Sequence, residues 1–202
     1  MAMKRFPITN AVGDLVAKYR DPDEKLYASL ELNQVAFPKT GMVVSQTPLG
    51  DAFTKANPCE NGMWVVADKA VGAINAPAAA TDSPIGIVYT AEKEYDMMHY
   101  GLQRFGRKVA GDYPRVGILG LGDTVTTNCL QYDDGEFATE QDLWDALDDI
   151  ANTPLYVGIE AGSPVPKLSA TKPNAGIYAK VVKYYTVPNG GKGVKYQIVS
   201  LG

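Results

Sequence analysis

The chain has 202 residues, of which 46% are hydrophobic and 21% charged, a balance that is typical of globular proteins and excludes a largely disordered chain. The formal net charge is −4 at pH 7, so no overall basic field attracts phosphate backbones, and we expect no direct nucleic-acid partner. No tract approaches the roughly 18 apolar residues of a membrane helix, and the first residues show no apolar core of a secretory signal. We therefore expect no membrane partner and synthesis in a cytoplasm.

The first 45 residues have a less regular pattern than the rest of the chain. Residues 12–19 place apolar side chains at helical spacing for about two turns, which should end before Pro22. Residues 25–37 fit neither the helical nor the strand period. We predict an N-terminal arm over residues 1–45, extended or partly helical, with a core element or a helical hairpin as the alternatives.

From Gly41 onward the pattern predicts mainly β structure. Short runs of β-branched and aromatic residues are bounded by Gly, Pro, Asn or Asp, as is typical of strands. These runs are residues 42–45, 62–66, 86–90, 115–119, 155–159 and 179–187. Residues 179–187 and 194–199 flank a glycine-rich segment that readily supplies positive φ angles, which predicts a β-hairpin.

One short amphipathic helix is predicted over residues 139–151. Thr139 can cap its N-terminus with Asp142 three residues on, the spacing of a capping box. One apolar stripe follows, formed by Leu143, Trp144, Leu147, Ile150 and Ala151. The helix should lie on a sheet. It either joins two subdomains, residues 46–136 and 152–202, or belongs to a single β-rich body over residues 46–202.

Residue types that perform chemistry are few. His99 is the only histidine, and we interpret it as a packing or surface residue. Residues 117–123 have the order G-x-x-G-x-G, which differs from a dinucleotide-binding motif, and we predict a turn or bulge followed by a strand at 124–128. The acidic clusters at 21–24 and 133–136 are interpreted as solvated turns. We expect no catalytic residue, no metal site and no cofactor.

Cysteine and tyrosine usage favours structural roles. Cys59 and Cys129 are two widely separated cysteines, which fit neither a disulfide framework nor a zinc site, and we expect both to be buried apolar groups. The chain has twelve tyrosines, three of them on the predicted terminal hairpin: Tyr184, Tyr185 and Tyr196. Such residues pack across strands, with subunit interfaces as the alternative.

Four segments resemble the capsid decoration, or cement, proteins of tailed bacteriophages. A strand, a small-residue loop and a returning Pro-Ile-Gly-Ile-Val strand occur over residues 61–68 and 76–90, and strands of similar style follow at 113–128 and 175–185. The resemblance covers roughly residues 55–200. It implies a β-barrel or β-tulip/sandwich-like body and no catalytic residues.

The function that this resemblance implies is structural. Such a virion protein is made in the bacterial host cytoplasm, lies on the capsid surface and clamps neighbouring copies of the major capsid protein. Self-association into a dimer or trimer is part of the same expectation. The alternatives are another virion component, such as a head fibre base or tail protein, and a glycan-binding β-domain with exposed Trp64 or Trp144 as stacking platforms. An enzyme is the least favoured class.

Overall fold

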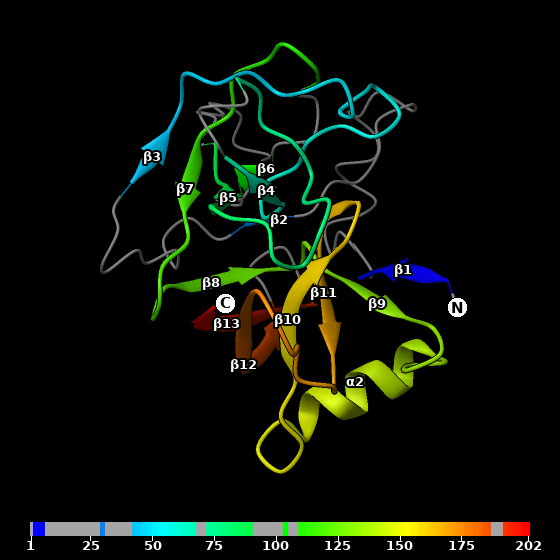
Figure 1. Ribbon diagram of the computed structural model, residues 1–202. Coiled ribbons are helices and arrows are strands. Elements are labelled where there is room, and N and C mark those ends of the chain that lie inside the picture. Colours follow the sequence, from blue (N-terminus) through cyan, green and yellow to red (C-terminus); the bar gives the residue numbers. More distant parts are fainter. Residues whose placement is uncertain are drawn as a thin grey trace.

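A computed structural model describes residues 2–6, 29–30, 42–67, 72–90, 103–104, 109–186 and 192–202, and every structural statement below concerns these ranges. They form two β-sheets and one helix (Figure 1). The predicted mainly β body with one short amphipathic helix is therefore confirmed. The N-terminal helix predicted within residues 12–19 lies outside the described residues.

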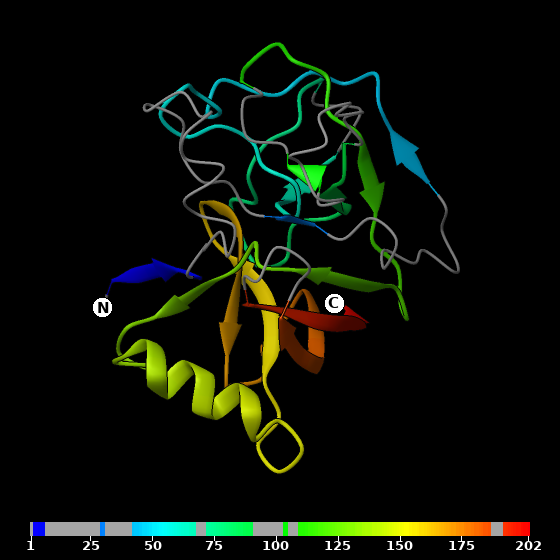
Figure 2. The ribbon, with the colours of Figure 1, turned by 180° about the vertical axis from the view of Figure 1, so that it is seen from behind.

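The larger sheet has nine strands and curls around a common core (Figures 1 and 2). In spatial order its strands are β1 (Met3–Arg5), β9 (Gln131–Asp133), β11 (Ser163–Ser169), β10 (Tyr156–Glu160), β12 (Ile177–Thr186), β13 (Lys192–Leu201), β8 (Thr124–Thr127), β2 (Ser29–Leu30) and β6 (Gln103–Arg104). The smaller sheet has four strands: β3 (Val43–Val44), β7 (Val116–Ile118), β5 (Ile85–Val88) and β4 (Trp64–Val66).

The predicted terminal hairpin is confirmed. Strands β12 and β13 pair antiparallel from Thr186 opposite Lys192 to Ile177 opposite Leu201. Two register shifts interrupt the ladder, one next to Tyr178 and one between Val181 and Lys183. Each shift is a β-bulge, which leaves an extra residue on one strand without a partner across the ladder.

Strand β11 was not predicted, because its sequence contains Pro164 and Pro166. A proline has no backbone N–H and is therefore confined to unpaired positions of a strand. The paired residues of β11 are Ser163 and residues 167–169, so both prolines lie outside the registered pairs. The strand runs antiparallel to β10 and parallel to β9.

Helix α2 (Glu140–Asp148) closes one end of the curled sheet (Figure 1). Both halves of the predicted capping box are present, since the Thr139 hydroxyl accepts from the Asp142 N–H and the Asp142 carboxylate accepts from the Thr139 N–H. Leu143 and Leu147 are buried in the core. Trp144 is half-buried, with its ring stacked on Tyr184 at 5.8 Å.

The two sheets meet at Trp64. This side chain belongs to β4 of the smaller sheet but is packed in the core of the larger one, with 1% of its surface exposed. Its indole N–H donates to the hydroxyl of Tyr196 at 3.0 Å, and the two rings meet edge to face at 5.9 Å. The glycan-stacking role considered for Trp64 is thus wrong, because the ring is buried.

Both predicted subdomain ranges contribute to the same structure. Strands β8 and β9 from residues 46–136 pair with β13 and β11 from residues 152–202. One core cluster gathers side chains from both ranges. From the predicted arm, β1 pairs with β9, while Phe6 and Leu30 are buried in that core.

The glycine-rich segment after β7 forms the predicted turn. Gly122 has a φ of +92°, and the carboxylate of Asp123 accepts from the Gly120 N–H at 2.7 Å. Strand β8 follows directly, where a nucleotide-binding loop would open a helix. Burial raises the pKa of the Asp123 carboxyl.

Candidate interaction surface

Strands β10, β12 and β13 present a surface made of lysines and tyrosines. Side chains alternate along each strand: Ala179 and Val181 point into the core, whereas Tyr178 and Lys180 are solvent-accessible. We call this surface the lysine face. Its members are Tyr156, Lys172, Tyr178, Lys180, Val182, Lys183, Lys195 and Gln197.

The strand register places the lysines close together. Lys180 lies opposite Tyr156 on one side and opposite Gln197 on the other, so these three side chains form a row across β10, β12 and β13. The next row brings Lys183 opposite Lys195. Among the described residues, no ion pair involves Lys180 or Lys195. Positive charge is therefore concentrated here, although the chain as a whole is acidic.

Apolar surface accompanies these charges. Val182 is the extra residue of a bulge in β12, and 53% of its surface is exposed. Tyr156 and Tyr178 meet edge to face at 6.1 Å, and the Lys172 ammonium lies 5.5 Å from the centre of the Tyr178 ring. A hydrogen bond to Tyr178 raises the pKa of Lys172. Tyrosine is enriched at protein interfaces, so the paired rings and the exposed Val182 are the part of this surface that suits contact with another protein.

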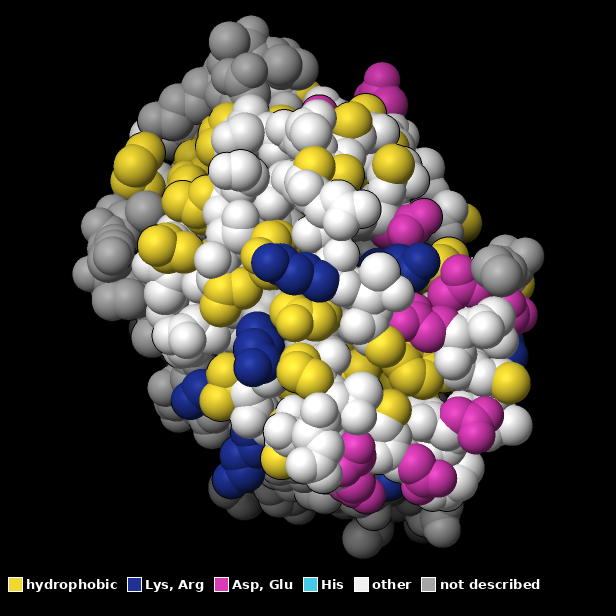
Figure 3. Space-filling model, turned by 60° about the horizontal axis from the view of Figure 1, so that its bottom comes forward, with side chains coloured by type: hydrophobic (Ala, Val, Ile, Leu, Met, Phe, Trp, Pro, Cys, Tyr) yellow, Lys and Arg dark blue, Asp and Glu magenta, His cyan; other side chains and the backbone are white. Residues whose placement is uncertain are grey.

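Acidic side chains gather elsewhere on the molecule. Asp145 and Asp148 are exposed in the C-terminal half of α2 and Asp149 is its exposed C-cap, while Asp133 ends β9 and Asp134 lies in the turn that follows. Figure 3 shows lysine and arginine side chains interspersed with hydrophobic ones, while most Asp and Glu side chains lie to the right of them. On the face seen in Figure 3, most acidic side chains therefore lie apart from the main group of basic ones.

The acidic segment at 133–136 contains the predicted turn, which is held by hydrogen bonds within it and to neighbouring segments. The Asp133 carboxylate accepts from the Gly135 N–H at 2.9 Å and lies 3.6 Å from the Lys167 ammonium. The Gly135 hydrogen bond is the main cause that lowers the pKa of Asp133. Glu136 accepts from the Ser169 hydroxyl at 3.0 Å and from the Ala170 N–H.

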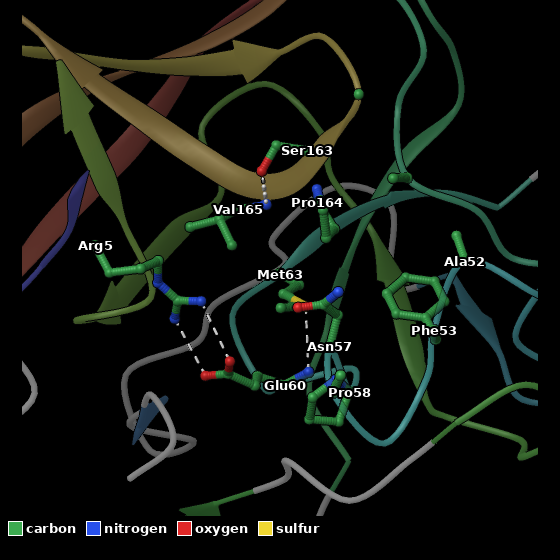
Figure 4. A pocket seen from close by; sticks show the side chains of 13 residues that line it. Arg5, Ala52, Phe53, Asn57, Pro58, Glu60, Met63, Ser163, Pro164 and Val165 are labelled. Carbon is green, nitrogen blue, oxygen red and sulfur yellow. Dashed lines mark hydrogen bonds and ion pairs between the residues drawn. The ribbon is translucent and has the colours of Figure 1, made fainter. Parts of the chain in front are cut away.

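A cavity of about 420 Å³ lies between the loop at residues 52–63 and the turn that joins β10 to β11 (Figure 4). Arg5 reaches it from β1 and makes a two-pronged ion pair with Glu60, with N–O distances of 3.2 and 3.1 Å. The remaining walls are mostly apolar: Ala52, Phe53, Ala56, Pro58, Met63, Ala76, Pro164 and Val165. Asn57, Gly162 and Ser163 complete the lining.

Both cysteines are buried, as predicted. Cys59 and Cys129 are each 0% exposed and belong to the core cluster of the smaller sheet. Burial raises the pKa of Cys129 to about 12. Burial also raises the pKa of Cys59. Both thiols are therefore protonated at neutral pH, and protonated thiols are poor nucleophiles.

The other residues that the sequence suggested for an interface or a site lie in the core, beside it, or outside the described residues. Tyr196 is a core residue, Tyr184 is half-buried beside Trp144, and the Tyr185 side chain lies outside the described part of the chain. His99 and the acidic cluster at 21–24 also lie outside it. In the part that the structure describes, no three His, Cys, Asp or Glu residues form a group that could hold a metal ion. No helix in that part is long and apolar enough to cross a membrane.

Neither the lysine face nor the cavity was predicted from the sequence. Local spacing did not indicate the lysine face, because Lys180 and Lys183 are three residues apart and a regular strand would place them on opposite faces; the bulge at Val182 brings both to one face. Comparisons with protein-family models, curated proteins and solved structures found no match.

Proposed function

We propose that the protein is a structural component of a tailed-bacteriophage particle, which binds the outer surface of the capsid and stabilises contacts between major capsid subunits. The observation that supports this proposal is the lysine face, an exposed patch of lysine, tyrosine and valine on a regular sheet. A sheet of paired strands fixes the backbone from which these side chains project. The backbone therefore has little conformational entropy to lose when the face binds a partner, although each lysine that becomes ordered loses rotamer freedom.

The chemistry of the face indicates the kind of partner surface. Lys180 and Lys195 favour carboxylates, while Val182 and the paired rings of Tyr156 and Tyr178 favour apolar contact. We propose that the major capsid protein supplies an acidic surface with an apolar centre. The charges would steer the encounter, and the apolar side chains would slow dissociation.

A protein that binds only the assembled shell stabilises that shell by mass action. We therefore propose that the protein acts on the capsid surface of the virion, where the assembled shell is available to it. Self-association into a dimer or trimer on the capsid would multiply the contacts of each bound molecule.

Co-sedimentation with purified phage heads that lack this protein tests the proposal. Saturable binding to heads, with no binding to the unassembled capsid protein, is the expected result. Failure to bind either form would contradict the proposal and would favour a head fibre, tail or glycan-binding role.

A further inference from the structure

The cavity beside β1 has a polar end whose two charges cancel. The Arg5 guanidinium and the Glu60 carboxylate face each other in a two-pronged pair, and Glu60 has only 7% of its surface exposed (Figure 4). A ligand with a free carboxylate or phosphate would gain from Arg5 but would be repelled by Glu60 at the same distance. The cavity therefore disfavours charged ligands.

A neutral amide suits this end better. The backbone C=O and N–H of one extended residue point to the same side of its chain, so the carbonyl can accept from the Arg5 guanidinium while the N–H donates to the Glu60 carboxylate. The Arg5 side chain keeps 35% of its surface exposed despite the ion pair. Of the five N–H donors of a guanidinium, the ion pair with Glu60 uses two, one Nη–H lies near the Cys129 sulfur at 3.9 Å, and the buried Nε–H faces no solvent, which leaves one Nη–H for a ligand.

The other walls are shaped for an apolar side chain. Phe53, Met63 and Val165 are almost fully buried and present carbon and sulfur atoms to the cavity, with Pro58 and Pro164 beside them. The rim contains exposed residues, Ala52, Asn57 and Gly162, so a ligand enters from solvent. A volume of about 420 Å³ is within the range of ligand sites.

We propose that this cavity binds a short, neutral, extended segment of a partner polypeptide, with one large apolar side chain against Phe53 and Met63 and the backbone N–H and C=O of the same residue against the Arg5–Glu60 pair. The site is separate from the lysine face and does not depend on the proposed capsid role. It gives the protein a second, sequence-selective contact with a partner chain.

Heteronuclear NMR of the full chain, with ¹⁵N labelling, tests this proposal with two capped peptides, acetyl-Gly-Phe-Gly-amide and acetyl-Gly-Gly-Gly-amide. The phenylalanine peptide should shift the amide signals of Glu60, Ser163 and Val165 saturably. The glycine peptide should bind at least about tenfold more weakly, since it lacks the apolar side chain. A third peptide with a methylated phenylalanine nitrogen should also bind more weakly, because it cannot donate to Glu60.

Two variants locate the binding. Ala52→Trp fills the rim of the cavity and should abolish the shifts, whereas Ala151→Trp places the same side chain at an exposed position outside the cavity and should leave them unchanged. The proposal is overturned if about 10 mM phenylalanine peptide produces no shift, if both tripeptides bind equally, or if the shifts survive Ala52→Trp.

Discussion

The hairpin of β12 and β13 has ten residues on each strand, whereas no strand of the four-stranded sheet has more than four. A long ladder sets its own register through alternating buried and exposed side chains. Short strands cannot do so, and the smaller sheet depends on its loops and on contacts with the larger sheet.

Replacement of Trp64 by alanine should have the largest effect, because this ring joins the two sheets. We expect the free energy of unfolding to fall by about 3–5 kcal/mol in urea titrations, the usual cost of emptying a large buried aromatic site. Trp64→Phe is the matched control. It keeps a ring but leaves the Tyr196 hydroxyl without its indole donor, and its cost should be smaller. Equal costs for the two variants would contradict this account of the junction.

Gly176 is a second junction between the regions. It has a φ of +75°, and a Cβ atom there would lie 1.7 Å from the carbonyl oxygen of Ala80 in the loop between β4 and β5. Gly176→Ala should cost more than the roughly 1–3 kcal/mol of backbone strain alone. Gly111→Ala supplies the comparison, since Gly111 has a φ of +87° but a Cβ atom there would meet no described atom within 4 Å. The contact with Ala80 would be unimportant if both variants lost the same stability.

The cap of α2 stabilises a helix that packs on the larger sheet, which contains the hairpin. Thr139→Ala removes the hydroxyl that accepts from the Asp142 N–H, and we expect a loss of about 1 kcal/mol. Thr139→Ser retains the hydroxyl and should remain near the wild-type stability in the same urea titration. A serine variant as unstable as the alanine variant would rule out the cap as the cause.

Asp133 should give the smallest effect, visible only in acid. Its pKa is lowered in the folded state, so the unfolded chain binds the proton more readily. The stabilisation from this carboxylate is therefore complete above the unfolded pKa of about 3.9 and disappears as the pH falls through the folded pKa. Asp133→Asn should flatten the dependence of the urea midpoint on pH below about pH 4. An unchanged pH profile would contradict the assignment.

The contrast between long, regular elements and short strands also explains which parts of the fold the sequence could predict. Residues 139–151 and 177–201 contain long, regular patterns, so the helix, its cap and the hairpin were predicted correctly. Strand β11 was missed because Pro164 and Pro166 mask a strand whose paired positions lie elsewhere. Its parallel pairing with β9 is a contact between distant parts of the chain that no local pattern records.

The lysine face and the cavity likewise depend on contacts that local sequence patterns do not record. Lys180 and Lys183 are three residues apart, so the pattern of a regular strand separates them, and only the bulge at Val182 in the observed register places both on one face. The cavity depends on Arg5 and Glu60, which are 55 residues apart and show no motif that links them. Only the pairing of β1 with β9 brings Arg5 to this place.

The most direct test of the proposed function is the binding of the Lys180→Glu/Lys195→Glu variant to phage heads that lack the protein. The matched control is Lys4→Glu/Lys55→Glu, which changes two exposed lysines outside the lysine face. Each pair lowers the net charge by four, from −4 to −8, so the overall charge is the same in both. We predict that the lysine-face variant binds at least about tenfold more weakly than the control, since the reversed charges would face an acidic partner. Equal binding of the two variants would contradict the lysine face as the capsid contact.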